Sequence, residues 1–565
     1  MLAAFLWWLL LGWIVHLYSI YDAAVWKPEA WKTEASEQLK NAILAFFSNL
    51  LGGKMATPAY DRLTALDSSF LLLESAHAPL HVASTLTFDA AALRTADGGI
   101  DADAVRARLA SELHRIPRYR QKIAWIPLTQ RPVWIDDDRF NIDYHVRHTS
   151  LPRPGNAHQL KRLSARIMEQ SLDQSRPLWE MWVVEGLEGG DRFALISKVH
   201  HCMIDGISGV DLLNTMLSPT PDADLKPEIQ RFIPRRVPTG FELWRDEMLR
   251  RIRLPFEVVR DVRQFVAEAA DARLEFMSRM RSVAAALGTS LRVASATPFN
   301  HKIGPHRRFD WLEMSLDDIK QIRRGLGGSI NDVVLTVVTG AVQRFLERRN
   351  LNPGQIDFRV MTPVSVRSPD QRGKLGNRVS AWFLDLPIGE PDPREQLRKI
   401  RAISLELKES KQAVAASMLT DMAEYGSSTL LALGARNVTR MLPFNLVVTN
   451  VPGPQVPIYM LGSRMLEMFP LVPLVDNMGL GIALMSYSGK LFWGFNADYD
   501  LLPDLGAFVR ATRDSFDELL KLSGLPPTLS GEGAAGGAEA GSSREGGGIR
   551  PPVGLEPQLH LVKQS

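Results

Sequence analysis

Two adjacent histidines, His200 and His201, and an aspartate four residues after the second, Asp205, are the residues best suited to chemistry in this sequence. Histidine is the side chain whose pKa lies nearest neutrality, so it can accept a proton from a reacting group and return it later. Gly206 follows directly, and glycine lets the backbone turn tightly. A lone histidine is more often a satisfied core residue, whereas this grouping in one short loop indicates general acid–base catalysis.

The residues on either side predict a strand, a loop and a helix. Residues 192–199 have the hydrophobic, β-tolerant composition of a buried strand. Downstream, Val210, Leu212, Leu213 and Met216 recur at helical spacing and give one apolar face. Loops that follow strands commonly present catalytic groups, so the histidine pair is predicted to lie at a strand end.

Cys202, the single cysteine of the chain, raises two alternatives. A thiol beside a histidine could act as a nucleophile, but side chains of adjacent residues usually point in different directions. His200 and His201 could also ligate a metal. No further His/Cys cluster lies at ligand-like spacing, so no metal site is predicted. One cysteine also excludes an intrachain disulfide and a Cys-rich zinc site.

Length and composition indicate a folded protein of two domains. A chain of 565 residues is too long for one ordinary core, and 45% hydrophobic with 23% charged residues is typical of globular proteins. The formal net charge of +3 is small for this length, which argues against a nucleic-acid partner bound through bulk charge.

The N-terminus carries a candidate membrane segment. Residues 2–21 contain no Asp, Glu, Lys or Arg and are long enough to span a bilayer as a helix. Lys27, Lys32 and Lys40 follow this segment, which predicts that the bulk of the chain lies in the cytoplasm. Alternatively, translation begins at Met55 and the segment is absent.

Strand and helix signals alternate through the rest of the chain, which favours α/β architecture. Residues 219–239 are rich in proline and charge and predict a linker. Residues 241–287 predict Arg-rich helices that either connect the domains or contact anionic lipid. Residues 531–548 are mostly Gly, Ala, Ser and Glu, cannot bury apolar surface, and are predicted to be disordered.

The His-His-x-x-x-Asp-Gly segment resembles the signature of acyl-CoA-dependent acyltransferases with the His-x-x-x-Asp motif. The closer resemblance is to bacterial wax ester synthase/diacylglycerol acyltransferases, because several other motifs of that family occur in order between about residues 63 and 520. These are Pro177-Leu178-Trp179, Asn331-Asp332 and the segments 66–74, 79–82, 361–367, 375–378 and 450–454. The Pro-Leu-Trp segment is expected to be scaffolding, and helix capping is a sufficient reason for one residue of Asn331-Asp332.

The resemblance implies an α/β fold with two chloramphenicol-acetyltransferase-like domains. Each domain would be a mixed sheet flanked by helices, with the active site in a channel between the domains. The predicted parts are an N-terminal extension (1–54), a first acyltransferase domain (55–218), a linker and helical connection (219–298), a second acyltransferase domain (299–525) and a Gly/Ala-rich tail (526–565).

The resemblance also implies O-acyl transfer from acyl-CoA, as co-substrate, to diacylglycerol and/or a long-chain alcohol, with no cofactor. His201 would be the general base and His200 would assist it. Asp205 would be structural or orienting, paired with an arginine elsewhere, and Gly206 would allow the tight turn. His81 is a further possible site residue, with a structural role expected. A membrane or lipid-droplet surface is the expected location.

Two other functions stay open at this point. A condensation-type acyltransferase would use a carrier-bound donor, although the chain has no evident carrier domain. A non-catalytic, membrane-tethered lipid-binding protein would have lost its chemistry, which the intact histidine motif argues against.

Overall fold

The computed structural model describes residues 59–203, 215–221, 232–250, 293–365, 379–409 and 444–524, all within one compact unit. The predicted N-terminal extension (1–54), the predicted tail (526–565), Asp205, Gly206 and most of the predicted connection (219–298) lie outside the described residues.

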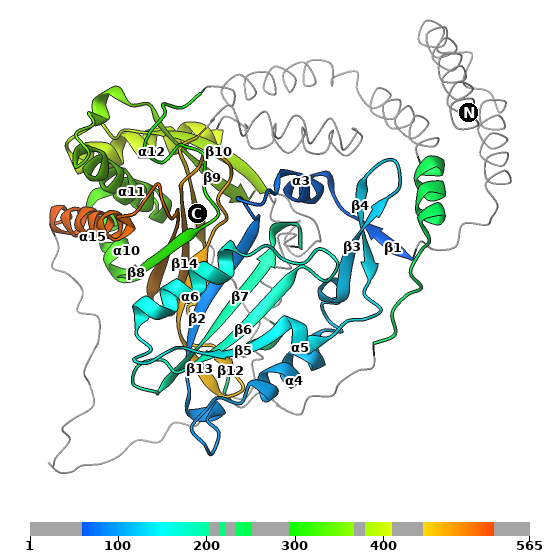
Figure 1. Cartoon of the computed structure of the whole chain (residues 1–565). Helices are drawn as coiled ribbons and strands as arrows, with labels where there is room; N and C mark the ends of the chain where they lie inside the picture. Colours follow the sequence, from blue (N-terminus) through cyan, green and yellow to red (C-terminus); the bar gives the residue numbers. More distant parts are fainter. Residues whose placement is uncertain are drawn as a thin grey trace, which may run out of the picture. The chain divides into compact units, whose positions relative to one another are not determined.

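The described chain is a mixed α/β fold with two six-stranded sheets, which confirms the predicted fold class (Figure 1). The first sheet has the order β12-β13-β2-β7-β6-β5. Its strands are β2 (His81–Asp89), β5 (Val146–Ser150), β6 (Trp179–Glu185), β7 (Arg192–His200), β12 (Tyr459–Met460) and β13 (Ser463–Leu471). Strand β7 is buried along eight of its nine residues, because it lies in the middle of this sheet with neighbours on both edges.

The second sheet has the order β10-β9-β11-β14-β15-β8. Its strands are β8 (Arg307–Ser315), β9 (Phe358–Ser365), β10 (Val379–Leu386), β11 (Leu446–Val451), β14 (Leu480–Tyr487) and β15 (Lys490–Asp498). A separate three-stranded sheet contains β1 (Tyr60–Arg62), β4 (Arg131–Asp136) and β3 (Gln121–Ile126).

Helices contact both large sheets (Figure 1). They are α3 (Ala65–Leu73), α4 (Ala102–Glu112), α5 (Ile142–His145), α6 (Ala157–Glu169), α10 (Leu316–Leu326), α11 (Ile330–Glu347), α12 (Pro393–Glu409) and α15 (Leu505–Leu522). Helix α11 is buried without interruption from Asp332 to Val342, because α10, α12 and α15 contact it. Among the described residues, no single helix has the length and hydropathy needed to span a membrane; α10 and α11 would reach them only together, and a 94° bend separates them.

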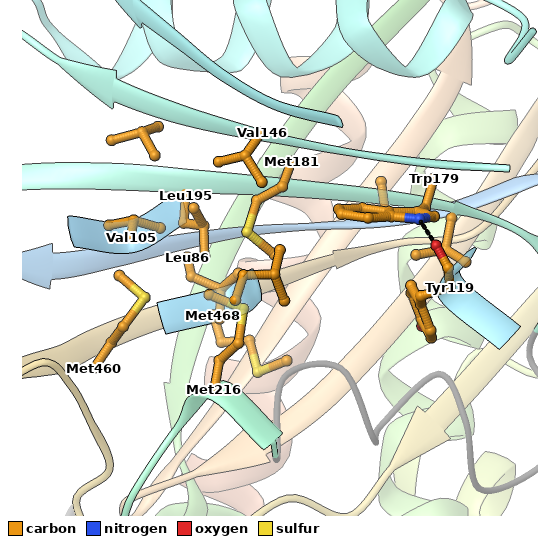
Figure 2. Close-up of a cluster of buried hydrophobic side chains, with 14 of the residues drawn as sticks. Leu86, Val105, Tyr119, Val146, Trp179, Met181, Leu195, Met216, Met460 and Met468 are labelled. Carbon is orange, nitrogen blue, oxygen red and sulfur yellow. Dashed lines mark hydrogen bonds between the residues drawn. The ribbon is translucent and has the colours of Figure 1, made fainter. Parts of the chain in front are cut away.

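The core beneath the first sheet is made from side chains far apart in sequence (Figure 2). Leu86 and Leu195 come from the central strands, Val105 from α4, and Met468 from β13. Strand β13 pairs antiparallel with β2, with Met468 opposite Leu86, so a segment from late in the chain completes a sheet begun near residue 81. Apolar burial of this kind contributes about 25 cal/mol per Å² and keeps the central strands in register.

Candidate active site

The end of β7 is held on both sides by backbone hydrogen bonds. His200 is the last residue of the strand, and His201 begins a short 3₁₀ turn, η4 (His201–Met203). The His200 N–H donates to the Leu178 carbonyl at 2.9 Å, and the His201 N–H donates to the Leu80 carbonyl at 2.8 Å. The predicted strand with histidines at its end is therefore confirmed, while most of the predicted helix beyond it lies outside the described residues.

His201 presents a neutral, partly exposed imidazole. Its ring stacks on that of Phe70 at 3.9 Å between centroids. The side chain is half-buried, and Nδ1 is buried without a hydrogen-bond partner among the described residues. Burial lowers the pKa of His201 to about 4, since a low-dielectric setting disfavours the imidazolium.

His200 points into the protein instead. Its Nδ1 lies 3.1 Å from the Cys202 backbone nitrogen and 3.0 Å from the Cys202 Sγ. A backbone N–H can only donate, so Nδ1 accepts and the proton of the neutral ring lies on Nε2. Nε2 faces Glu74, at 3.5 Å from Oε2. The two neighbouring histidines therefore occupy different environments, one facing a buried carboxylate and one partly open.

Glu74 lies outside the His-His-x-x-x-Asp-Gly motif and is the last residue of the family segment 66–74. It follows α3, and its second carboxylate oxygen, Oε1, lies 3.4 Å from His81 Nε2. Gln174 Nε2 donates to Oε2 at 3.0 Å. Burial raises the pKa of Glu74, but the contacts with His200 and His81 outweigh burial and hold the pKa well below its usual range. The available sequence signal is its place at the end of segment 66–74, where it is the one acid in residues 68–82.

His81 lies on β2 directly opposite His200 in the antiparallel register. Its ring is buried, and the centroids of the two imidazoles are 5.7 Å apart. Burial lowers the pKa of His81 to about 4, with Glu74 raising it in partial compensation. His81 therefore faces the carboxylate from a second strand, and its contacts are those of an internal support.

Cys202 is buried and shielded from reaction. Burial, together with the carboxylates of Asp67 and Glu74, raises the pKa of its thiol well above the usual value. Because the thiolate is the nucleophilic form, these surroundings oppose a covalent role. No group of three or more described His, Cys, Asp or Glu residues is arranged to hold a metal ion.

The Pro177-Leu178-Trp179 segment supports the end of β7. Trp179 is fully buried, and its Nε1 donates to the Tyr119 carbonyl at 2.8 Å (Figure 2). Its indole stacks on His145 with centroids 4.5 Å apart. The preceding carbonyl, that of Leu178, accepts the His200 N–H, so this segment braces the strand that carries the histidines.

Asn331 and Asp332 lie at the start of α11. Ser329 is the N-cap rather than either of these residues: its Oγ accepts the Asp332 N–H at 3.2 Å, and Asp332 Oδ2 accepts the Ser329 N–H at 2.7 Å. Asn331 Oδ1 accepts from Asn450 Nδ2 at 2.7 Å, which joins α11 to β11. No hydrogen bond, ion pair or ring contact among the described residues links Asn331 or Asp332 to His201.

Comparison with known proteins identifies the family of this chain. Residues 63–334 match the wax ester synthase/diacylglycerol acyltransferase catalytic domain, and residues 375–520 match the C-terminal domain of the same family. A Mycobacterium tuberculosis protein provisionally named a diacylglycerol O-acyltransferase is 33% identical over 501 residues, which cover 86% of this chain and 96% of the relative.

Solved structures support the same family assignment. The wax ester synthase/diacylglycerol acyltransferase from Marinobacter aquaeolei VT8 is 25% identical, with a TM-score of 0.56 over 82% of this chain and 100% of that one. The starter condensation domain of rhizomide synthetase shares the fold alone, at 12% identity and a TM-score of 0.51 over 82% and 95% of the two chains. This chain is thus an acyltransferase and belongs to the wax ester synthase/diacylglycerol acyltransferase family.

Proposed function

We propose that this enzyme transfers a long-chain acyl group from acyl-CoA to diacylglycerol and/or a long-chain fatty alcohol, with His201 as the general base. The observation that carries the proposal is the neutral, partly exposed imidazole of His201 at the end of β7, in a chain of this family. The name of the Mycobacterium tuberculosis relative supports diacylglycerol as an acceptor, and that of the Marinobacter structure supports both products.

The chemistry needs one base that later acts as an acid. His201 Nε2 takes the proton from the acceptor hydroxyl, whose oxygen attacks the thioester carbonyl of acyl-CoA. A tetrahedral oxyanion forms, and its collapse breaks the carbon–sulfur bond. The protonated imidazole then returns the proton to the departing CoA sulfur, which leaves the ester and free CoA. His200 takes a supporting part, and Asp205 a structural one.

The test is release of free CoA thiol from palmitoyl-CoA by the purified protein, with either hexadecanol or diolein as acceptor. A positioned general base contributes about 100-fold or more to rate, so His201→Ala should lower acceptor-dependent release by at least about that factor. His158→Ala is the matched control and should leave the rate unchanged, because His158 is exposed on α6, a helix that contacts β2 and β7 of the same sheet.

The outcomes separate the alternatives. Release that needs an acceptor and vanishes in His201→Ala supports the proposal, and the faster acceptor names the main product. Release that persists in His201→Ala removes that residue as the base. If no CoA thiol is released with either acceptor, the proposed reaction is wrong. A carrier-bound acyl donor or a non-catalytic lipid-binding role would then replace it.

The same proposal places the reaction at a lipid surface, since both acceptors are insoluble in water. Leu128 is 84% exposed at the tip of the β3–β4 hairpin, and Phe241 is 59% exposed. Their sequence neighbours are in contact, because a Cβ added to Gly240 would stand 3.3 Å from Pro127 Cγ. Trp244 adds an aromatic ring 5.9 Å from that of Phe241. Exposed apolar side chains gathered in this way suit a membrane or lipid-droplet surface.

A further inference from the structure

The carboxylate of Glu74 lies between two buried imidazoles that no step of the proposed chemistry uses. It stands 3.4 Å from His81 Nε2 and 3.5 Å from His200 Nε2. We infer that Glu74 is a positioning residue for acyl transfer, which holds His200 and, through His200, the turn that carries His201. The inference rests on the proposed function, in which His201 is the base.

One helix supports both histidines of the motif. Helix α3 contacts η4, and its Phe70 stacks on the His201 ring at 3.9 Å. Glu74 comes four residues after Phe70, and residues four apart at a helix end project to the same side. The Glu74 N–H donates to the Phe70 carbonyl at 3.1 Å, so the carboxylate is placed by the last turn of the helix. The side of α3 that orients the catalytic ring thus also orients its neighbour.

Glu74 acts on the His201 turn by determining which ring nitrogen of His200 carries the proton. The Cys202 N–H needs an acceptor, and His200 Nδ1 supplies it at 3.1 Å. This arrangement requires the ring proton to be on Nε2, where a buried N–H without an acceptor would be costly. Glu74 Oε2 faces that position. Loss of the carboxylate would favour the other tautomer, which would put an N–H against the Cys202 N–H and loosen η4.

Both ends of the His201 residue are therefore fixed. Its own N–H bonds to the Leu80 carbonyl, and the next N–H, that of Cys202, bonds to His200. Gln174 steadies the carboxylate from outside, since its Nε2 donates to Glu74 Oε2 at 3.0 Å. His81 approaches the other oxygen from β2. A displacement of about 1 Å in a catalytic group can lower rate by about 100-fold, so the stiffness of this turn matters to catalysis.

The first variant is Glu74→Gln, which keeps the size of the side chain but replaces one oxygen with a donor. Because only one side-chain oxygen remains, glutamine cannot present an acceptor to both Nε2 atoms. We expect kcat to fall about 10- to 100-fold, while the KM values for palmitoyl-CoA and the acceptor stay within about twofold. Glu74→Asp, which keeps the charge but withdraws it from both rings, should also lower kcat and serves if the glutamine variant is insoluble.

The decisive measurement is a double-mutant cycle with His200→Asn. Asparagine can place its Oδ1 near the position of His200 Nδ1 and accept the Cys202 N–H without needing Glu74. If Glu74 acts through His200, Glu74→Gln should cost no more than about twofold in kcat when His200 is already asparagine. Equal losses in both backgrounds would mean a merely structural role and would overturn the inference.

Glu112→Gln is the matched control, because Glu112 is another buried carboxylate in the same half of the chain. Its oxygens pair with Arg108 and Arg115 on and beside α4. This variant should lower the melting temperature and leave kcat unchanged. A Glu74→Gln enzyme with the kcat of wild type would overturn the inference while His201 remained the base. Absence of acceptor-dependent release by wild type would remove the proposed function and this inference together.

Discussion

At the scale of residues, the site depends on two identical side chains with different surroundings. His200 faces inward to a carboxylate, and the half-buried His201 stacks on Phe70. The change from strand to 3₁₀ turn falls between them, so their side chains leave the backbone in different directions. The same change of direction buries Cys202. The raised pKa of its thiol makes Cys202 a poor nucleophile.

The pKa of His201 predicts the pH dependence of the enzyme. In the proposed mechanism the active form is the neutral base. Burial lowers the pKa of His201 to about 4, so kcat/KM should be constant from pH 8 to about 5.5 and fall as pH drops through about 4. Quantifying the ester product between pH 4 and 8, with tryptophan fluorescence to confirm folding, would check this. An acidic limb centred near pH 6.5, the ordinary value for histidine, would contradict it.

Sequence patterns identify the histidine pair and place Glu74 and His81 in family segments, but they do not show that these residues meet. The pair is recognisable because its residues are neighbours in one loop. Glu74 reaches the site only because β2 and β7 pair in a register that sets His81 opposite His200, and because α3 ends beside them. Such long-range pairings follow from the packing of the whole domain, which no local pattern encodes.

At the scale of elements, the local sequence predicts individual helices and strands but not which strands pair. The apolar residues 333–346 favour a helix by their composition, and α11 extends from Ile330 to Glu347 because Ser329 and Asp332 cap its start. Strand β13 is different, since its partner β2 lies at the other end of the chain. Alternation within β13 can indicate a strand, but the choice of sheet depends on which edge is open when the chain folds.

The β3–β4 hairpin shows a local conflict that function can explain. Leu128 has a φ of 65°, a conformation that leucine rarely adopts, and its side chain is almost fully exposed. Asparagine or glycine would suit this backbone better. Strained residues tend to be kept where they serve a function, and an exposed leucine at a hairpin tip suits the proposed lipid contact.

Leu128→Asn should therefore weaken lipid binding without destabilising the fold. Burying a leucine side chain contributes about 2 kcal/mol, so binding should weaken by about tenfold or more. The measurement is co-sedimentation with diolein-containing phosphatidylcholine vesicles, using the chain that begins at Met55 so that the predicted membrane segment does not contribute. Leu405→Gln, at an exposed leucine on α12, is the control. Equal binding by wild type and Leu128→Asn would contradict the prediction.

At the scale of the whole molecule, the two sheets are joined by specific contacts. The Arg307 N–H at the start of β8 donates to Glu169 at the end of α6, at 3.0 Å. Further along β8, Trp311 stacks on Phe469 of β13 at 4.5 Å between centroids. Family similarity also runs through both sheets, since the catalytic-domain match continues to residue 334. The site at β7 therefore belongs to a core that both halves of the chain complete.

This core contains histidines that must stay neutral. His145 is buried, its Nδ1 donates to the Trp179 carbonyl at 2.8 Å, and its ring stacks on both Trp179 and Phe140. Burial lowers the pKa of His145 to about 4, as it does for His81. In the unfolded chain both would titrate near the ordinary value of about 6.5. The unfolded state therefore binds more protons between these values, and the free energy of unfolding must fall as pH falls from about 6.5 to 4.

Each such histidine should lower the free energy of unfolding by about 3 kcal/mol between pH 6.5 and 4. The stability of wild type should therefore fall steeply over this range. In His145→Gln, the amide can still donate to the Trp179 carbonyl, but no proton is taken up there on unfolding. That variant should be less stable than wild type at pH 7 and lose less on acidification. Urea midpoints followed by tryptophan fluorescence at pH 7, 6 and 5 would show this, with exposed His158→Gln expected to parallel wild type. If His145→Gln and wild type lose stability in parallel, acid sensitivity arises elsewhere in the molecule.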